Sequence, residues 1–485
     1  MQNDNAAFHH DPNDPVATTA RPGEKAKMDL AYAAALNNGT LSEPPLPLRH
    51  IPDKVRDLES AEYEPFDNRE VDHPLSNFDV LFHMMKASCG SGILAMPQAF
   101  YHAGYAVGLL GTAIIGFICT YCVHILIQSE HAICKRRKVP SLNYHEIARE
   151  GFNEGPPIFK RMSKMAEYCE HTFLCIYQMG TMSVYTVFIA NSLYVVVKAH
   201  GVDIDIRLYM CMLLVPLILI NFVRNLKYLA PLSSFALVAT VVAFGVTLKF
   251  IFTDLPPVTD REPVGEIKNL PLFFGTVIFA LEAIGVVVPL GNEMRRPREY
   301  LGITGVLNRG MVPIVLLYIF LGFFGYIKYG SAAEGSITLN LPPDDPLAQA
   351  VKLLIAVAIF GTHPLQCYVV IDIVWGTYLQ PRLLKHPHVL TIEYVVRAAI
   401  VTIAFLFAVA IPNLGPFISL VGALSLSMVG IMLPSLIQLS TFWYQTKGAA
   451  FHWLLVKNVL LSVFALIGLV SGTYSSIMDI MSGSH

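Results

Sequence analysis

The chain has 485 residues, of which 54% are hydrophobic and only 14% are charged, whereas about 25% of the residues in an ordinary soluble domain are charged. Its mean hydropathy is +0.51 and its formal net charge is −2. These values argue against a soluble enzyme and against a basic nucleic-acid-binding protein, and they favour a polytopic membrane protein.

The first segment of the chain, residues 1–76, differs from everything after it. It lacks apolar periodicity and is rich in Pro, Asp and Asn. Fourteen acidic and seven basic residues fall within residues 1–78. Such a composition is typical of disorder. We therefore predict a disordered acidic tail over 1–76, a transmembrane domain over 77–477 and a short C-terminal tail over 478–485.

Apolar segments recur throughout the predicted transmembrane domain. A helix that crosses a bilayer needs about 20 predominantly apolar residues. Eleven segments approach or exceed this length: 78–101, 104–129, 165–198, 208–223, 229–253, 271–291, 308–329, 348–379, 390–411, 416–442 and 454–477. The sequence therefore predicts an all-α polytopic membrane protein with about eleven transmembrane helices.

Basic residues gather in alternate loops and set the predicted orientation. The loop over 130–164 carries eight Lys and Arg residues, whereas the loop over 330–346 carries none. Loops rich in Lys and Arg face the cytosol. We therefore expect the N-terminus to be cytosolic.

The first span contains residues that interrupt a helix. Gly90, Ser91 and Gly92 lie in mid-span and Pro97 follows. Glycine costs about 1 kcal/mol and proline about 3 kcal/mol inside a helix. Unwound backbone within a bilayer is tolerated only where it lines a protein cavity. Its free N–H groups can bind a substrate carboxylate, although small residues can also simply allow close helix packing.

The sixth span contains a second interruption. Glu282 and Gly285 lie near its centre and Pro289 follows. The two interrupted spans occupy matching positions if spans 1–5 and 6–10 are inverted repeats, and such a pair is the best sequence indicator of a transporter site. We expect carbonyl groups exposed around Ala280, Leu281 and Gly285 to meet a substrate ammonium group.

Two ionisable residues in these spans are candidates for proton coupling. Histidine changes charge between about pH 5 and 8, which makes His83 in span one a candidate. A charged acid at mid-span costs roughly 2.5–3.5 kcal/mol, so Glu282 is either a proton carrier or a group that holds the broken helix and the substrate. The alternatives are a hydrogen-bonded structural histidine and an acid satisfied by neighbouring backbone.

Two further residues are candidate substrate contacts. Tyr177 lies in span three and Thr362 lies at a polar interruption of span eight. A buried tyrosine more commonly satisfies its hydroxyl within the core, and this alternative stays open for Tyr177.

The interrupted spans carry a resemblance to a known family. Residues 83–97 read HMMKxxxGxGILxMP, residues 279–294 read FALEAIGVVxPLxNxM and residues 224–233 read RNLKYLAPxS. This pattern resembles the proton-coupled amino acid transporters (solute carrier family thirty-six), within the amino acid/auxin permease group. The resemblance implies a leucine-transporter-like five-plus-five inverted repeat with an eleventh helix. It also implies symport of protons with glycine, alanine or proline, and a coupling role for His83.

The expected function is therefore proton-coupled symport of small neutral L-amino acids by alternating access. The expected partners are these amino acids, protons and the lipid bilayer, with no nucleic acid, no metal and no cofactor besides the coupling proton. The expected location is the plasma membrane, the late endosome or the lysosome. An amino acid sensor with little transport and an ion channel remain as alternatives. An enzyme is not expected, because the sequence shows no nucleophile–base set and no cluster of metal ligands.

Overall fold

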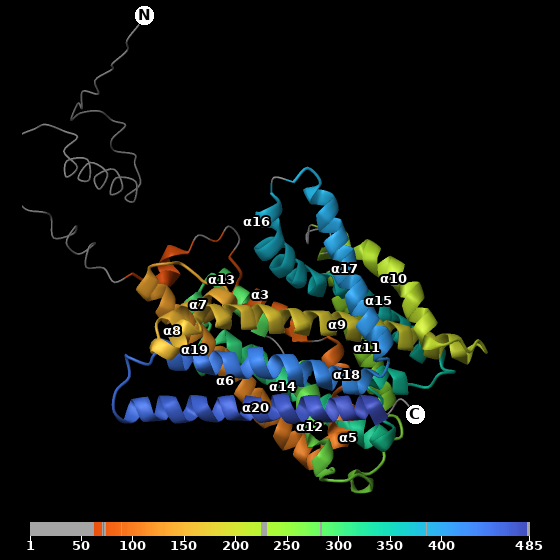
Figure 1. The fold of residues 1–485 in the computed structure, drawn as a ribbon. Coiled ribbons are helices and arrows are strands. Elements are labelled where there is room, and N and C mark those ends of the chain that lie inside the picture. Colours follow the sequence, from red (N-terminus) through yellow and green to blue (C-terminus); the bar gives the residue numbers. More distant parts are fainter. Residues whose placement is uncertain are drawn as a thin grey trace, which may run out of the picture. The chain divides into compact units, whose positions relative to one another are not determined.

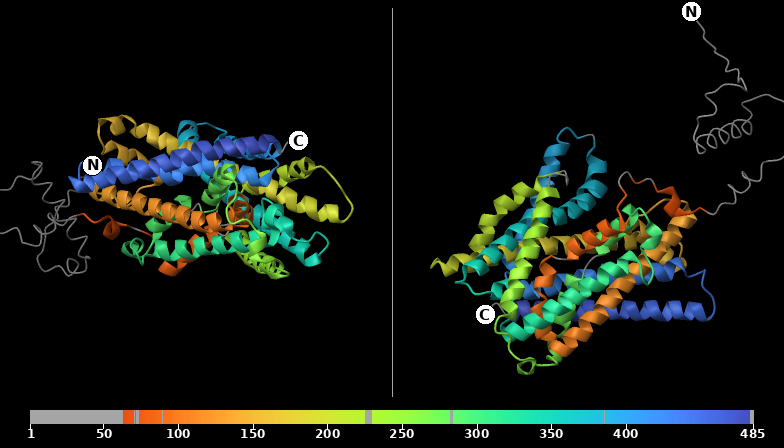
Figure 2. Two further views of the ribbon diagram at one scale, coloured as in Figure 1. Left: turned by 90° about the horizontal axis from the view of Figure 1, so that it is seen from below. Right: turned by 180° about the vertical axis from the view of Figure 1, so that it is seen from behind.

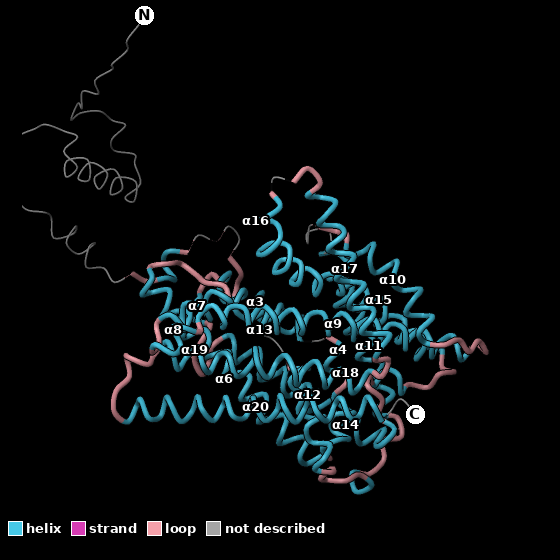
Figure 3. The backbone as a smooth tube through the Cα atoms, in the orientation of Figure 1, coloured by secondary structure: helices cyan, strands magenta, loops and turns pink. Residues whose placement is uncertain are grey.

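The structure of the chain is a computed structural model. Helices make up nearly all of the residues that it describes (Figures 1 and 3). The structure describes residues 63–69, 71, 74–88, 90–224, 230–281, 284–384 and 386–482. Within these residues the β pairing consists of an isolated bridge between Leu75 and Met294. Residues 1–62, most of the predicted acidic tail, lie outside the described residues.

The helices follow the predicted spans closely. In chain order they are α3 (Asn77–Ser88), α4 (Ser91–Leu94), α5 (Met96–Ala103), α6 (Tyr105–Arg137), α7 (Tyr144–Asn153), α8 (Pro157–Arg161), α9 (Ser163–Ala199), α10 (Ile206–Asn221), α11 (Ala230–Phe252), α12 (Leu270–Ala280), α13 (Ile284–Glu293), α14 (Val306–Tyr329), α15 (Pro346–Ile371), η9 (Asp372–Leu379), α16 (Gln380–Leu383), α17 (Val389–Ala410), α18 (Leu414–Val421), η10 (Gly422–Met432), α19 (Leu433–Thr441) and α20 (Ala449–Ser482).

These helices form eleven spans. Eight are long and apolar enough to cross a membrane as single units. The fourth is the shorter α10, while the first (α3 to α5) and the sixth (α12 and α13) are each divided. The expected all-α class is thus confirmed. The spans of the described residues follow in the predicted order, and the first and the sixth, which begin the two sets of five, are the divided ones. The eleventh helix, α20, follows the second set.

Short irregular helices join and flank the spans. The 3-10 helices are η2 (Pro65–Asn68), η4 (Val258–Asp260), η5 (Ile267–Asn269), η6 (Pro297–Glu299), η7 (Gly330–Ala332) and η8 (Ile337–Asn340). The segments η9 and η10 are π-helices within spans eight and ten. Insertions of this kind are frequent at functional sites.

Two boundaries differ from the expectation. The structured body begins at Tyr63 rather than at residue 77, because Arg69 donates hydrogen bonds to the carbonyls of Pro140 and Gly291, both at 3.0 Å. At the other end α20 continues to Ser482. Most of the expected C-terminal tail over 478–485 is therefore helical, since residues 478–482 contain no helix-breaking proline or glycine.

Local chemistry explains where several helices begin and end. The Asp345 carboxylate caps α15 by accepting from the N–H groups of Leu347 at 2.7 Å and Ala348 at 3.3 Å. Gly104 ends α5 with a φ of 79°, a left-handed conformation that favours glycine. Asn143 and Glu146 form a capping box at the start of α7. These signals are all visible in the sequence.

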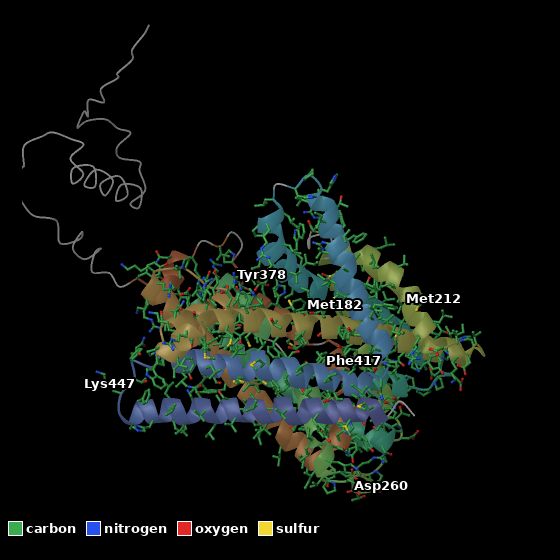
Figure 4. All side chains as sticks on the ribbon, viewed as in Figure 1. Met182, Met212, Asp260, Tyr378, Phe417 and Lys447 are labelled. Carbon is green, nitrogen blue, oxygen red and sulfur yellow. The ribbon has the colours of Figure 1, made fainter. Side chains whose placement is uncertain are left out.

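The centre of the body is built from the divided spans and the long helices that pack on them. The first half of span six, α12, packs against α4, α5, α18 and η10, and α9 packs along α15. The helix α12 also packs against α6 and α20, and α14 packs against α5 and α6; Figure 2 shows the same helices from two further sides. The amphipathic helix α7 lies at one end of the body, which we call the α7 end. Lys447 lies at this end and Asp260 at the opposite one (Figure 4).

Candidate functional site

The break in span one lies at Gly90. The helix α3 ends at Ser88, Gly90 is extended with a φ of −96° and a ψ of −156°, and α4 begins at Ser91. No side chain caps the start of α4 among the described residues. Ser91 and Gly92 are both buried. The predicted interruption is therefore present, and the helix that follows it begins without a side-chain cap.

The break in span six lies just after Ala280. The N–H of Leu281 closes α12 by bonding to the Val277 carbonyl, and α13 begins at Ile284. Glu282 lies outside the described residues, so its predicted role in proton coupling stays a prediction. Pro289 lies inside α13, so the interruption precedes the proline in the chain.

The two breaks are in direct contact. A Cβ atom added at Gly92 would lie 2.6 Å from the Cα and 3.1 Å from the Cβ of Ala280. Only glycine allows the two backbones to approach this closely. Gly92 and Ala280 are therefore neighbours in space, while their expected role in substrate binding stays a prediction.

Tyr318 on α14 bridges the two breaks. Its fully buried hydroxyl is within hydrogen-bonding distance of the Ser88 carbonyl, where α3 ends, and lies 2.8 Å from the Ala280 carbonyl, where α12 ends. These two carbonyls close the helix halves on either side of the site. Sequence reasoning missed Tyr318, although a tyrosine hydroxyl in an otherwise apolar span is the signal that could have identified it.

Two long helices supply aromatic residues next to the breaks. The ring centroid of Tyr177 on α9 lies 6.0 Å from that of Phe279 on α12, so Tyr177 packs next to the end of α12, and its expected contact with substrate stays a prediction. Further along α9, the Tyr185 hydroxyl would lie 3.9 Å from a Cβ added at Gly90. It also accepts a hydrogen bond at 3.2 Å from Nε2 of Gln366 on α15. Sequence reasoning missed Tyr185 and Gln366.

Two of the predicted residues are placed apart from this contact. The Thr362 hydroxyl donates to the Ile359 carbonyl of its own helix at 3.0 Å. His83 lies on the exposed face of α3, opposite the buried Val80 and Met84. Its role as a coupling group stays a prediction. Gly285 is exposed and is the second residue of α13, the helix that follows the break in span six.

Several buried polar atoms around the breaks have no hydrogen-bond partner among the described residues. They include Oε1 of Gln178 on α9 and the hydroxyls of Ser425 and Ser427 on η10. Both helices pack against each other, and η10 also packs against α12. Buried polar groups are normally paired, so these atoms are candidates for contacts with a polar ligand. The sequence motifs did not single them out.

The second half of span six is tied to the segment that precedes span one. Leu75 donates its N–H to the Glu293 carbonyl at 2.8 Å and accepts from the Arg295 N–H at 2.9 Å. Arg69 is held by the Gly291 carbonyl and lies 3.9 Å from the Glu130 carboxylate. Burial lowers the pKa of the Arg69 guanidinium. These contacts hold the segment before span one against the second half of span six.

The chain is similar to known transport proteins over most of its length. Residues 73–478 match the family model described as transmembrane amino acid transporter protein. The chain is 40% identical to the Drosophila melanogaster proton-coupled amino acid transporter-like protein pathetic, over 88% of this chain and 90% of that protein. It is 26% identical to the Arabidopsis thaliana amino acid transporter ANT1, over 84% and 93% of the two chains.

Solved structures were also found to be similar. Mhp1, a nucleobase-cation-symport-1 family transporter, in a closed conformation with bromovinylhydantoin matches with a TM-score of 0.48 and 15% identity, over 87% of this chain and 94% of that chain. Its inward-facing conformation matches with a TM-score of 0.48 and 16% identity, over 88% and 93%.

Proposed function

The chain belongs to the transmembrane amino acid transporter family, and from this membership we propose that it is a symporter of protons and small neutral L-amino acids. The family assignment makes it a multi-pass membrane transporter of amino acids and not an enzyme. The proposal goes beyond this family assignment by naming small neutral amino acids as the substrates and the proton as the coupling ion. It also keeps the N-terminus cytosolic and the location at the plasma membrane, late endosome or lysosome.

The contact between Gly92 and Ala280 carries the proposal. It brings the first turn of α4, directly after the break in span one, against the last residue of α12, directly before the break in span six. Divided helices of this kind offer N–H groups to a substrate carboxylate and carbonyl groups to its ammonium. The close approach of the two backbones leaves little room for a long side chain and favours glycine, alanine or proline.

Tyr318 suggests how the site opens and closes. Its hydroxyl links α14 to the ends of α3 and α12, so the divided spans are held together in this state. A substrate shifts the balance between two states only by binding one of them more strongly. Alternating access then requires that the amino acid and the proton both favour the state in which these contacts form.

His83 and Glu282 are the proposed proton carriers. His83 lies on an exposed face of α3, and the family resemblance implies its involvement. Glu282 is the second residue after the end of α12 in the chain. Protonation of either group removes or adds a charge beside the divided helices and so biases their movement.

Uptake by the purified protein in proteoliposomes tests the proposal. A panel of radiolabelled amino acids is offered at two external pH values, with and without sodium. We expect uptake of glycine, alanine and proline that rises with the inward proton gradient and does not need sodium. Binding without uptake would favour the sensor alternative, and current without substrate would favour the channel alternative.

A further inference from the structure

Three potential metal ligands meet at the α7 end, away from the divided spans. His145 comes from α7, and Glu170 and His171 come from α9, which packs against α7. Each residue offers one ligand atom, and these atoms all lie within 4.8 Å of one another. The rings of His145 and His171 have centroids 4.7 Å apart. Two imidazoles and one carboxylate therefore share one small volume.

Glu170 is the unusual member of this cluster. Its side chain is 2% exposed, and its Oε2 has no hydrogen-bond partner among the described residues. This oxygen lies 3.8 Å from Nε2 of His171. A buried carboxylate without a partner is costly unless it pairs or coordinates a metal. The geometry of Glu170 therefore indicates that a positively charged group belongs beside it.

Tyr378 orients His171 for ligation. The Tyr378 hydroxyl lies 2.7 Å from Nδ1 of His171 and comes from the π-helix η9 (Figure 4). When this hydroxyl accepts from Nδ1–H, the lone pair of the ring remains on Nε2, the nitrogen nearest Glu170. Metal-bound histidines nearly always have such an outer partner, which sets the tautomer and the ring orientation.

The neighbouring charges leave the cluster open to a cation. Arg149, the nearest base on α7, is engaged by Glu150 at 2.9 Å and by Glu167 at 3.3 Å. Among the described residues, no Lys or Arg forms an ion pair with Glu170. His145 is half-buried. An ion can therefore reach the cluster from the surface at the α7 end.

We propose that His145, Glu170 and His171 form a binding site for a divalent transition-metal ion, with Zn²⁺ as the preferred ion. Two imidazoles and one carboxylate with an open fourth position are a known Zn²⁺ ligand set, with metal–ligand bonds of roughly 2.0–2.2 Å. Ligand atoms around such an ion lie roughly 3.3 Å apart, so small side-chain rotations suffice. Mg²⁺ and Ca²⁺ prefer oxygen ligands.

This site would add a metal-mediated link between three elements, two of which are already joined by the ion pair between Arg149 and Glu167. The ion would bind α7 to span three directly and to η9 of span eight through Tyr378. An ion that binds only the folded protein stabilises it by RT ln(1 + c/Kd), where c is the free ion concentration. The site is independent of the amino acid site, and its presence does not require that the proposed symport is correct.

Metal binding by the full-length protein tests this inference. The protein is purified without a polyhistidine tag, stripped with a chelator and titrated with Zn²⁺ by calorimetry and with Co²⁺ by visible absorption. We expect one ion per chain, a higher melting temperature with Zn²⁺, and Co²⁺ bands without sulfur charge transfer. Glu170→Gln and His171→Ala should each weaken binding by at least about tenfold.

His200→Ala provides a matched control, because His200 caps the opposite end of α9 through the Val196 carbonyl. Its metal affinity should equal that of the unmodified protein. If His171→Ala does not elute as a folded monodisperse species, the half-exposed His145→Ala provides the same test. Equal affinity in all variants would overturn the inference. A sulfur charge-transfer band would also overturn it, by assigning the ion to the nearby Cys169 or Cys175.

Discussion

Replacing Gly92 by alanine tests the contact between the two divided spans. The new methyl carbon would lie 2.6 Å from the Cα of Ala280, whereas carbon atoms pack comfortably at roughly 3.5–4.0 Å. The two backbones must therefore separate by about 1 Å. Overpacking of this kind destabilises the state with this contact by about 1–3 kcal/mol. That free energy corresponds to a roughly 5- to 150-fold change in the equilibrium between the state with the contact and the state without it.

Gly90→Ala is the matched control for this experiment. A Cβ atom at Gly90 would meet its nearest neighbours, the Ala87 carbonyl and the Tyr185 hydroxyl, at 3.9 Å, which is ordinary contact. Its effect on the equilibrium should stay within about 0.5 kcal/mol, or about twofold. Initial uptake rates in proteoliposomes, normalised to reconstituted protein, measure both variants. Equal rates for Gly92→Ala and Gly90→Ala would refute the reasoning.

Three further predictions follow from individual side chains. Tyr318→Phe leaves buried carbonyl acceptors unsatisfied, so it should lower the free energy of unfolding by about 1–3 kcal/mol. An unchanged melting temperature would show that the Tyr318 hydroxyl does not hold the two divided spans together. His83→Ala should abolish the pH dependence of uptake at a normal protein level, and retained pH dependence would exclude His83 from coupling. The hydrogen bond from His131 lowers the pKa of Glu64 from its usual 4.5, so this contact stabilises residues 63–69 above that pH and is lost as the pH falls through the lower folded value. Hydrogen exchange in 63–69 should therefore accelerate under acid, and Glu64→Gln should remove that acid dependence.

Much of the fold could be predicted from the sequence because it depends on local patterns. Each of the eleven apolar segments coincides with a helical span, although α6 continues to Arg137 and α20 runs from Ala449 to Ser482, because hydropathy and helix length are properties of each segment alone. The interruptions at Gly90–Gly92 and near Gly285 could likewise be located, because glycine and proline weaken helices wherever they occur.

The π-helices η9 and η10 could not be predicted. Each is an insertion into an otherwise ordinary apolar helix, and no residue type in either segment marks it. The early start of the body at Tyr63 was also missed. The contacts of Arg69 with Pro140 and Gly291 connect segments far apart in the chain, and composition alone does not show them.

The sequence located the two helix breaks, whereas the side chains that contact them could not be identified from it. Gly92 and Ala280 were assigned to one site from their matching positions in two spans. Tyr318 and Tyr185 were missed, because their roles depend on which helix faces which. The cluster at His145 was missed for the same reason, since His145 reaches Glu170 only after α7 folds back onto α9.

Accumulation of alanine against its own gradient tests the central claim most directly. Proteoliposomes that contain the purified protein are given an inward proton gradient in sodium-free buffer, and internal alanine is followed to its steady level. We predict a level above the external concentration that collapses when a protonophore is added. An internal level that never exceeds the external one, whatever the proton gradient, would contradict proton-coupled symport.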